Sequence, residues 1–248
     1  MKDKIKIGNY RWFICFLLFA IATLNYLDRQ VLSLLHPFLS DKFNWTNSDY
    51  ANITSMFQLG YAVMYLFAGR FADWFGTRKT LLLAAIICSI ATIMHIFSTF
   101  IGAALYNIFT IAGFAISFSV IGFIVSRFFL ALGSAAIFPT ALKAAALWFP
   151  DKERTFASGI YISGASVGAI AAPLIVPPIV LYLGWESAFV IAGAAGFIWV
   201  FVWIAYYNVP DMLLKRKRIK QSEYDYINGD ESEKLYNAKA DENKEKTG

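Results

Sequence analysis

The chain has 248 residues, of which 58% are hydrophobic and 16% carry a charge. About a quarter of the residues of a soluble domain are usually charged, so this composition is typical of an integral membrane protein. The net charge is +5, but the basic residues lie in short segments between apolar runs, where they indicate membrane topology. Because no basic patch with interleaved aromatic residues lies outside the apolar runs, we expect no nucleic-acid partner.

Six apolar segments are long enough to cross a bilayer as helices, which takes about 20 residues each. We predict them at residues 12–39, 49–71, 80–101, 119–147, 155–183 and 187–207. Hydropathy alone leaves the fourth segment ambiguous. The loops at Arg78 and Lys152 are both basic and should both face the cytoplasm, so two crossings connect them. Residues 102–118 then form an apolar connection on the outer face, either re-entrant or interfacial.

These segments predict an all-α membrane protein, a bundle of six transmembrane helices. Both termini should be cytoplasmic, because the predicted inner loops carry the basic residues and the outer loops carry only Lys42. We expect a six-helix transmembrane domain at residues 1–210, followed by a cytoplasmic linker and disordered tail at residues 211–248. The tail is too polar to bury enough apolar surface to order itself.

Three charged residues lie well inside the predicted spans, namely Asp28, Arg29 and Arg127. Each costs about 2.5–3.5 kcal/mol at the centre of a membrane helix, so each should face a water-filled cavity or another charge. One interpretation is a buried Asp–Arg pair that only locks two helices together. One aspartate cannot neutralise two arginines, however, and the surplus positive charge favours an anionic ligand.

Helical spacing extends this candidate site. Asn25 and Tyr26 lie about one turn before Arg29 on the first span. On the second span a polar and aromatic stripe is formed by Gln58, Tyr61 and Tyr65. Such a stripe suits a sugar, whose hydroxyl groups need hydrogen bonds and whose C–H face packs on rings. Each tyrosine taken singly is equally consistent with packing or interfacial anchoring.

The sequence gives no sign of catalysis or of a bound metal. The two histidines, His36 and His95, lie in different predicted helices without a paired carboxylate nearby, and Cys15 and Cys88 lie singly in apolar runs. We interpret all four as structural residues. We therefore predict no enzyme activity, no cofactor and no metal site.

The predicted loop between the second and third spans reads GRFADWFGTRK from residue 69. With Gly69, Asp73, Gly76 and Arg78 it resembles the loop signature of the major facilitator superfamily, although Trp74 stands where that family usually has Arg or Lys. The resemblance implies that Asp73 pairs with basic groups and helix ends to hold one conformation of a rocking transporter.

Other runs resemble the anion:cation symporter branch of that superfamily, and most closely bacterial hexuronate transporters, over about residues 10–228. They are NYLDRQVLS at 25–33, RFFLALG at 127–133 with the following Phe138-Pro139, WFP at 148–150 and GWESAF at 184–189. This resemblance implies the N-terminal half of a major-facilitator fold in a bacterial plasma (inner) membrane. The implied activity is proton-driven uptake of a sugar acid such as glucuronate or galacturonate.

The same resemblance implies roles for individual residues. Arg29 and Arg127 would hold the substrate carboxylate, Tyr26 and Tyr61 would line the sugar site, and Asp28 would carry the coupling proton. Ser134 stands where the branch usually has a glutamate. The coupling ion is therefore expected to be either H⁺ or Na⁺. Coupling through Asp28 alone and the absence of coupling also remain alternatives.

The length of the chain departs from the superfamily, which has two six-helix halves with the substrate between them. We expect a truncated or split carrier that needs a missing C-terminal half or a second copy of the chain. Two alternatives are a homodimeric half-transporter and a non-transporting six-helix membrane component.

Overall fold

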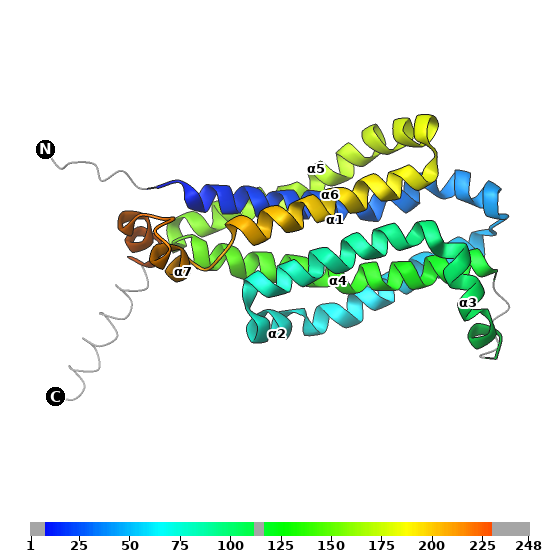
Figure 1. Cartoon of the computed structure of the whole chain (residues 1–248), viewed down its shortest axis with the longest axis horizontal. Helices are drawn as coiled ribbons and strands as arrows, with labels where there is room; N and C mark the ends of the chain where they lie inside the picture. The colour runs from blue at the N-terminus through cyan, green and yellow to red at the C-terminus, as the bar shows by residue number, and fades with distance from the viewer. Residues whose placement is uncertain (1–7, 112–116, 230–248) are drawn as a thin grey trace, which may run out of the picture.

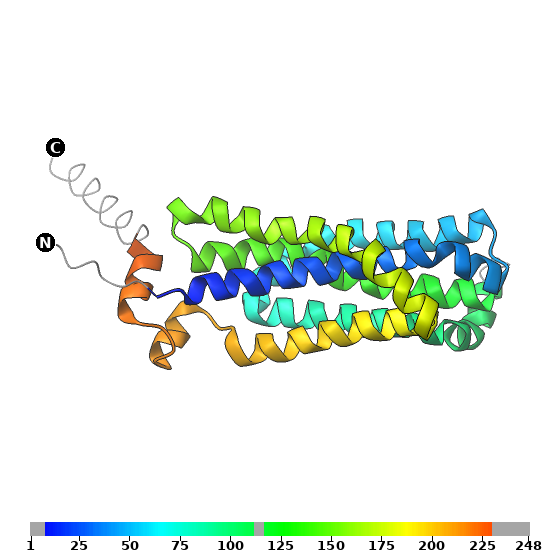
Figure 2. The ribbon, with the colours of Figure 1, turned by 90° about the horizontal axis from the view of Figure 1, so that it is seen from above.

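The computed structural model describes residues 8–111 and 117–229, and these residues are helical with no strand among them. Long helices run side by side along one axis. The first helix begins, and the last described helical stretch lies, at the same end of the bundle, here called the near end (Figure 1, Figure 2). The elements are α1 (Tyr10–Phe43), α2 (Asn47–Met94), the 3₁₀ helix η1 (His95–Phe97), α3 (Ser98–Ile111), α4 (Phe118–Trp148), α5 (Asp151–Leu183), α6 (Trp185–Tyr206) and α7 (Pro210–Lys215).

The helix α2 is two membrane crossings joined by a sharp turn. Its backbone leaves helical geometry at Gly76, where φ is 74° and ψ is 160°, a conformation that glycine adopts without a steric penalty. The chain turns back at this point and runs towards the far end (Figure 1). Together with α1, α4, α5 and α6, the two limbs of α2 give six crossings in the described residues. The predicted all-α bundle of six helices is therefore confirmed.

The turn at Gly76 is fastened to the end of α6. The hydroxyl groups of Thr77 and Tyr207 lie 2.7 Å apart. The indole nitrogen of Trp203 donates to the carbonyl of Arg78 at 3.1 Å, and Arg78 Nη2 donates to the carbonyl of Ile204 at 3.1 Å. These bonds hold the turn against α6 at the near end of the bundle.

Close helix packing depends on small residues. A Cβ atom on Gly164 of α5 would lie 2.5 Å from the carbonyl oxygen of Phe19 on α1, and one on Gly168 would clash with the carbonyl oxygen of Thr23. The two backbones therefore touch directly, which is how helices associate tightly where lipid removes the hydrophobic driving force. This contact fixes α5 against the helix that carries Asp28 and Arg29.

The apolar core forms two clusters, and the gap between them falls at the charged residues. On α1 the buried members of the near cluster end at Ile21 and those of the far cluster begin at Val31. On α4, which runs in the opposite direction, the far cluster ends at Ile124 and the near cluster begins at Leu130. The polar layer therefore occupies the middle of the bundle, half-way along its length.

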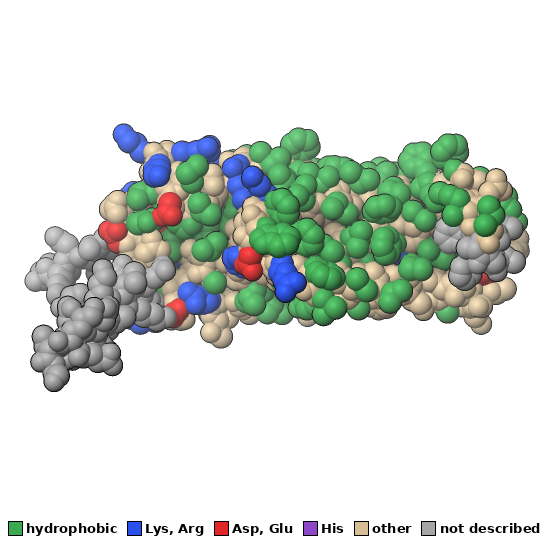
Figure 3. Space-filling model, turned by 90° about the horizontal axis from the view of Figure 1, so that it is seen from below, with side chains coloured by type: hydrophobic (Ala, Val, Ile, Leu, Met, Phe, Trp, Pro, Cys, Tyr) green, Lys and Arg blue, Asp and Glu red, His purple; other side chains and the backbone are tan. Residues whose placement is uncertain are grey.

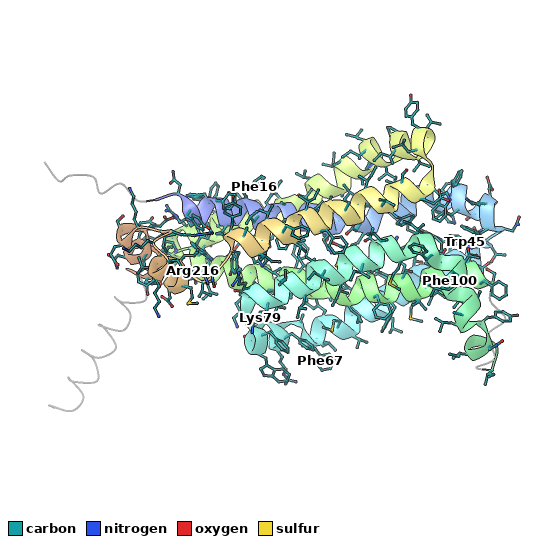
Figure 4. All side chains as sticks on the ribbon, in the orientation of Figure 1. Phe16, Trp45, Phe67, Lys79, Phe100 and Arg216 are labelled. Atoms are coloured by element: carbon teal, nitrogen blue, oxygen red, sulfur yellow. The ribbon has the colours of Figure 1, made fainter. Side chains whose placement is uncertain are left out.

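The surface matches the predicted membrane setting. Apolar side chains cover the length of the bundle, and charged side chains gather at the near end (Figure 3). Phe16 and Phe67 point away from the bundle, while Lys79 and Arg216 lie towards its near end (Figure 4). Exposed aromatic groups along the shaft are expected where lipid, and not water, is the solvent.

The predicted apolar connection 102–118 is helical over its first part. The helix α3 lies at the far end and projects from the bundle (Figure 1). A Cβ atom on Gly102 would clash with the backbone of Phe118, and one on Gly122 would clash with the backbone of Ser98, so α3 begins directly against α4. Residues 112–116 lie outside the described residues, and the interfacial or re-entrant character of the connection stays a prediction.

The segment after α6 is folded back onto the bundle. It contains α7 and a further helical stretch at residues 221–229. Glu223 and Ile227 are buried on one face of this stretch, and Ile219, in the bend before it, is buried as well. The sequence had suggested only a linker here. Residues 230–248 of the predicted tail lie outside the described residues, so the division at residue 210 remains a prediction.

Candidate functional site

The polar layer is built around two arginines on α1 and α4. Arg127 is 4% exposed, and its Nη1 and Nη2 atoms point at the carbonyl oxygen of Arg29, at 3.5 and 3.4 Å. Asp28 and Asn25 on α1 are also buried. The layer thus gathers the charged residues that the sequence placed in the first and fourth spans.

Aromatic rings surround the guanidinium group of Arg29. Its Cζ atom lies 4.5 Å from the ring centre of Tyr61, 5.1 Å from that of Tyr26 and 5.3 Å from that of Phe57. Arg127 lies 5.7 Å from the same Phe57 ring. Such cation–π contacts orient a cation without neutralising its charge.

Neither arginine has a carboxylate partner within 4.0 Å among the described residues. Arg29 Nε and Nη2 and Arg127 Nε are buried and make no hydrogen bond. An unpaired cation at membrane depth costs free energy that packing does not return. The arrangement therefore leaves positive charge and free N–H donors available to an anion.

A cavity of about 200 Å³ opens beside the two arginines, between α1, α2 and α4. Its lining residues are Tyr26, Arg29, Gln30, Ser33, Thr54, Phe57, Gln58 and Arg127. A second cavity of about 270 Å³ shares Tyr26 and is lined also by Tyr61, Tyr65 and Phe138. Polar and aromatic groups therefore form one continuous surface on this side of the bundle.

Six of the seven predicted substrate-binding residues line one of these two cavities. Asn25 does not, because its Nδ2 atom donates to Ser134 Oγ at 2.8 Å inside the bundle. Sequence reasoning missed Gln30, Ser33 and Thr54. Helical spacing could have identified two of them, since Ser33 lies one turn beyond Arg29 and Thr54 lies one turn before Gln58.

Asp28 lies on the interior side of the arginines and lines neither cavity. It forms no ion pair within 4.0 Å in the part of the chain that the structure describes. This structure therefore shows no direct ion pair between Asp28 and an arginine that would lock two helices together.

The loop motif meets α4 at the near end. Asp73 forms an ion pair with Lys143, whose Nζ atom also donates to the carbonyl of Ala72 at 3.4 Å. Gly76 provides the turn and Arg78 binds the end of α6. Gly69 has open space around its Cα. The expected pairing of Asp73 with a basic group thus has a specific partner, on the helix that also carries Arg127.

The described residues contain no group of three metal-ligating side chains close enough to hold an ion. The buried polar groups of the site are guanidinium, amide, hydroxyl and one carboxyl group. This set suits recognition of an organic anion through hydrogen bonds and charge.

Comparison with known proteins places these features in a family. A family model described as Major Facilitator Superfamily matches residues 18–229. The chain is 33% identical over 230 residues to a hexuronate transporter of Escherichia coli strain K12, which covers 92% of this chain and 48% of the relative. It is 29% identical over 222 residues to a galacturonate transporter of Dickeya chrysanthemi, covering 90% of this chain and 58% of the relative.

A third relative is a probable sulfoacetate transporter of Cupriavidus necator, 31% identical over 93% of this chain and 49% of its own length. Among solved structures, a proton:xylose symporter superposes with a TM-score of 0.66 at 16% identity, over 88% of this chain and 49% of that one; this likeness concerns the fold alone. The chain spans about half the length of the curated relatives it matches.

Proposed function

Since this chain belongs to the Major Facilitator Superfamily, a family of transporters and not of enzymes, we propose that it forms the N-terminal six-helix half of a carrier that takes up sugar acids, such as hexuronates, together with protons. One observation carries this proposal. Arg127 is buried and Arg29 is half-buried; neither has a carboxylate partner within 4.0 Å among the described residues, and both face a cavity lined by tyrosine and glutamine side chains.

The charge of the site supports an anionic substrate. Arg29 and Arg127 converge on one cavity, and their free N–H groups match the two oxygens of a carboxylate. Hexuronate, galacturonate and sulfoacetate, named for three relatives, are all organic anions. The bound anion would supply the negative charge that the described residues do not.

The remaining lining supports a sugar acid over a smaller anion. Gln30 and Gln58 offer amide donors and acceptors for hydroxyl groups, and Tyr26 and Tyr61 offer ring faces for the C–H side of a sugar ring. Carbohydrate recognition needs this mixture because each hydroxyl group must keep a hydrogen bond when it leaves water.

Asp28 is the proposed proton carrier. It is buried, and the residue after it, Arg29, is the one whose backbone carbonyl Arg127 contacts. The protonation state of Asp28 and the occupancy of the arginine by an anion therefore influence each other through charge. We assign the near end to the cytoplasm of a bacterial inner membrane, because the basic side chains gather there (Figure 3).

The second wall of the site is proposed to come from a six-helix partner, either a C-terminal half or a second copy of this chain. In the superfamily the substrate lies between two such halves. The cavities at Arg29 and Tyr65 would face that partner, which would enclose the substrate from the other side.

Uptake of radiolabelled glucuronate tests the proposal in cells that lack their own hexuronate carrier and express this chain with a complementary C-terminal half. We expect uptake that collapses when an uncoupler removes the proton gradient. Arg29→Gln and Arg127→Gln should each remove an N–H pair to the carboxylate, which costs about 2–5 kcal/mol of binding, at least about a thirtyfold loss.

Arg216→Gln is the matched control, because Arg216 is exposed at the near end and far from the cavity. Uptake that is unchanged in both cavity variants would contradict the proposed site. Full uptake by this chain expressed alone would replace the split carrier with a homodimer. No uptake by any version present in the membrane would overturn the proposed substrate class.

A further inference from the structure

The interior of the bundle holds buried polar atoms that make no hydrogen bond to other described atoms. Asn25 Oδ1, Thr92 Oγ1, His95 Nε2 and Ser98 Oγ belong to this group, and each residue is at most 1% exposed. Most buried polar atoms in proteins have a partner, so such a cluster indicates bound water or a functional group. None of the four lines the two cavities at Arg29.

His95 has the chemistry of a proton acceptor in this cluster. Its Nδ1 atom lies 2.8 Å from the carbonyl oxygen of Ala91. Because a carbonyl only accepts, Nδ1 carries the hydrogen, and Nε2 keeps a free lone pair. The ring stacks on Phe189 at 4.8 Å and 4°, with the edge of Phe123 at 5.3 Å. These contacts fix the imidazole and leave one basic nitrogen unused.

The neighbours of His95 connect it to Asp28. Thr92 lies one helical turn before His95. Asn25 Nδ2 lies 3.9 Å from Cys88 Sγ, and α1 and the second limb of α2 both run towards the far end (Figure 1). Asp28 and Thr92, each about one turn further along its helix, therefore lie at the same level.

On α4 the ring of Phe123 packs on the imidazole, and Arg127 lies one turn further along the same helix. The guanidinium group of Arg127 points at the backbone carbonyl of Arg29, the residue that follows Asp28. From α6 the Phe189 ring packs on the imidazole. The two titratable groups therefore lie on one polar line, with Arg127 beside both.

We propose that His95 relays the coupling proton between the far end of the bundle and Asp28, along an interior path separate from the substrate cavity. The path runs from Ser98 through His95 and Thr92 to Asp28. This inference rests on the proposed function, since it names the route by which the coupling proton reaches the carboxyl group.

Each step of the relay conserves protons and charge. A proton from water at the far end adds to the Nε2 lone pair of His95 and gives an imidazolium ion. The imidazolium passes that proton, through a water molecule beside Thr92, to the Asp28 carboxylate. His95 returns to its neutral form, and Asp28 becomes a neutral carboxyl group.

Arg127 connects this path to the substrate. Its positive charge repels the imidazolium form of His95. A substrate carboxylate that binds Arg127 from the cavity side offsets this charge, and proton transfer through His95 becomes easier once the anion is bound. The proton and the substrate anion then bind cooperatively, although they enter from different sides of Arg127.

The relay can be tested without any substrate, on the chain in lipid nanodiscs. Infrared spectroscopy follows hydrogen–deuterium exchange of the protonated Asp28 carboxyl group, whose band is assigned by its absence in Asp28→Asn. His95→Asn can keep the bond to Ala91, and His95→Phe keeps the stack on Phe189. Both lose the free nitrogen, and we expect exchange at Asp28 to slow by about tenfold or more in each.

His36→Asn is the matched control, because the other histidine stacks on Tyr50 and has no place on this path. We expect wild-type exchange in this variant. Exchange at Asp28 that keeps its wild-type rate in both His95 variants would overturn the relay. Equal slowing in His36→Asn would also overturn it, because the effect would not be specific to His95.

A second readout uses proteoliposomes that contain this chain and its complementary half. Glucuronate counterflow, which needs no net proton movement, should persist in the His95 variants, while accumulation driven by a proton gradient should fall by about tenfold or more. Equal loss of both activities would contradict a relay role. Failure of glucuronate transport in the wild type would refute the proposed substrate and leave the infrared result to decide the relay.

Discussion

Arg11 and Arg127 are buried to a similar extent, 6% and 4% exposed, but their surroundings differ. Arg11 lies at the near end, where its Nε atom meets Glu153 Oε2 at 2.9 Å and its backbone N–H donates to Glu223 Oε1 at 3.1 Å. Tyr226 donates to the same Glu153 at 2.9 Å. In the described part of the chain, Arg127 makes no ion pair, and its hydrogen bonds go to the carbonyl oxygen of Arg29, at 3.4–3.5 Å.

The difference supports a structural role for the first arginine and the proposed binding role for the second. The Arg11 group joins the starts of α1 and α5 to the helical stretch at 221–229, and its charges compensate one another. At Arg127 the compensation is missing although the site is deeper in the membrane. An uncompensated cation at such depth is a candidate for ligand binding, which is the role that we propose for it.

The largest expected effect is on the compensated site. Arg11→Met removes the cation between Glu153 and Glu223 and leaves Glu223 buried without its partner, which should cost about 3–5 kcal/mol. Thermal unfolding in detergent can be followed with a thiol-reactive dye, because Cys15 and Cys88 are both free and buried. An unchanged unfolding temperature would show that the Arg11 group does not hold the near end together.

The opposite sign is expected in the middle of the bundle. Arg127→Met replaces an uncompensated cation by an apolar side chain of similar length and should stabilise the chain by about 2 kcal/mol. The same dye assay should show a higher unfolding temperature, while glucuronate uptake is lost. A fall in stability as large as that of Arg11→Met would remove the distinction between the two sites.

A smaller effect probes the packing around the compensated site. A Cβ atom on Gly8 would meet the carboxyl group of Glu223. Gly8→Ala must therefore displace this carboxyl group from Arg11, which should lower the free energy of unfolding by about 1–3 kcal/mol. Gly69→Ala is the control, since the space around that glycine is open. Equal unfolding temperatures for the two variants would argue against close docking of the 221–229 helix.

The smallest effect is the pH dependence at Glu153. Burial raises the pKa of Glu153, but hydrogen bonds from Arg11 and Tyr226 and the charge of Arg11 outweigh it and hold the pKa below its ordinary value of 4.5. A carboxyl group with a lowered folded-state pKa contributes stability above its unfolded pKa and loses it as the pH falls through the folded value. Unfolding temperatures measured from pH 6 downwards, where about pH 6 lies above both values, should therefore fall less steeply in Glu153→Gln than in the wild type.

Much of the bundle could be predicted because lipid imposes simple rules. Helix length and basic loops predicted six crossings. Intramembrane charge and helical spacing predicted that Arg29, Arg127 and the tyrosines belong to one site. Asn25 shows where this reasoning stops. Its spacing from Arg29 fixes a helix face only roughly, and the neighbouring Ser134 on α4 decides which way the amide points.

The near end was less predictable because its signal is weak. Ile219, Glu223 and Ile227 have the spacing of a buried helix face, but a glutamate in a charged segment is usually exposed. Its burial depends on Arg11, more than two hundred positions earlier in the chain. The Asp73–Lys143 pair has the same character, since only the folded bundle brings the α2 turn to α4.

The docking of Glu223 also sets where the molecule can bend. Because Arg11 and Ile227 tie the 219–227 stretch to α1 and α5, this stretch turns as one rigid body with the six crossings. A hinge between this bundle and any partner joined through the same chain must then lie beyond Ile227. A spectroscopic probe on Asp225, which is exposed, would therefore report the orientation of the whole bundle.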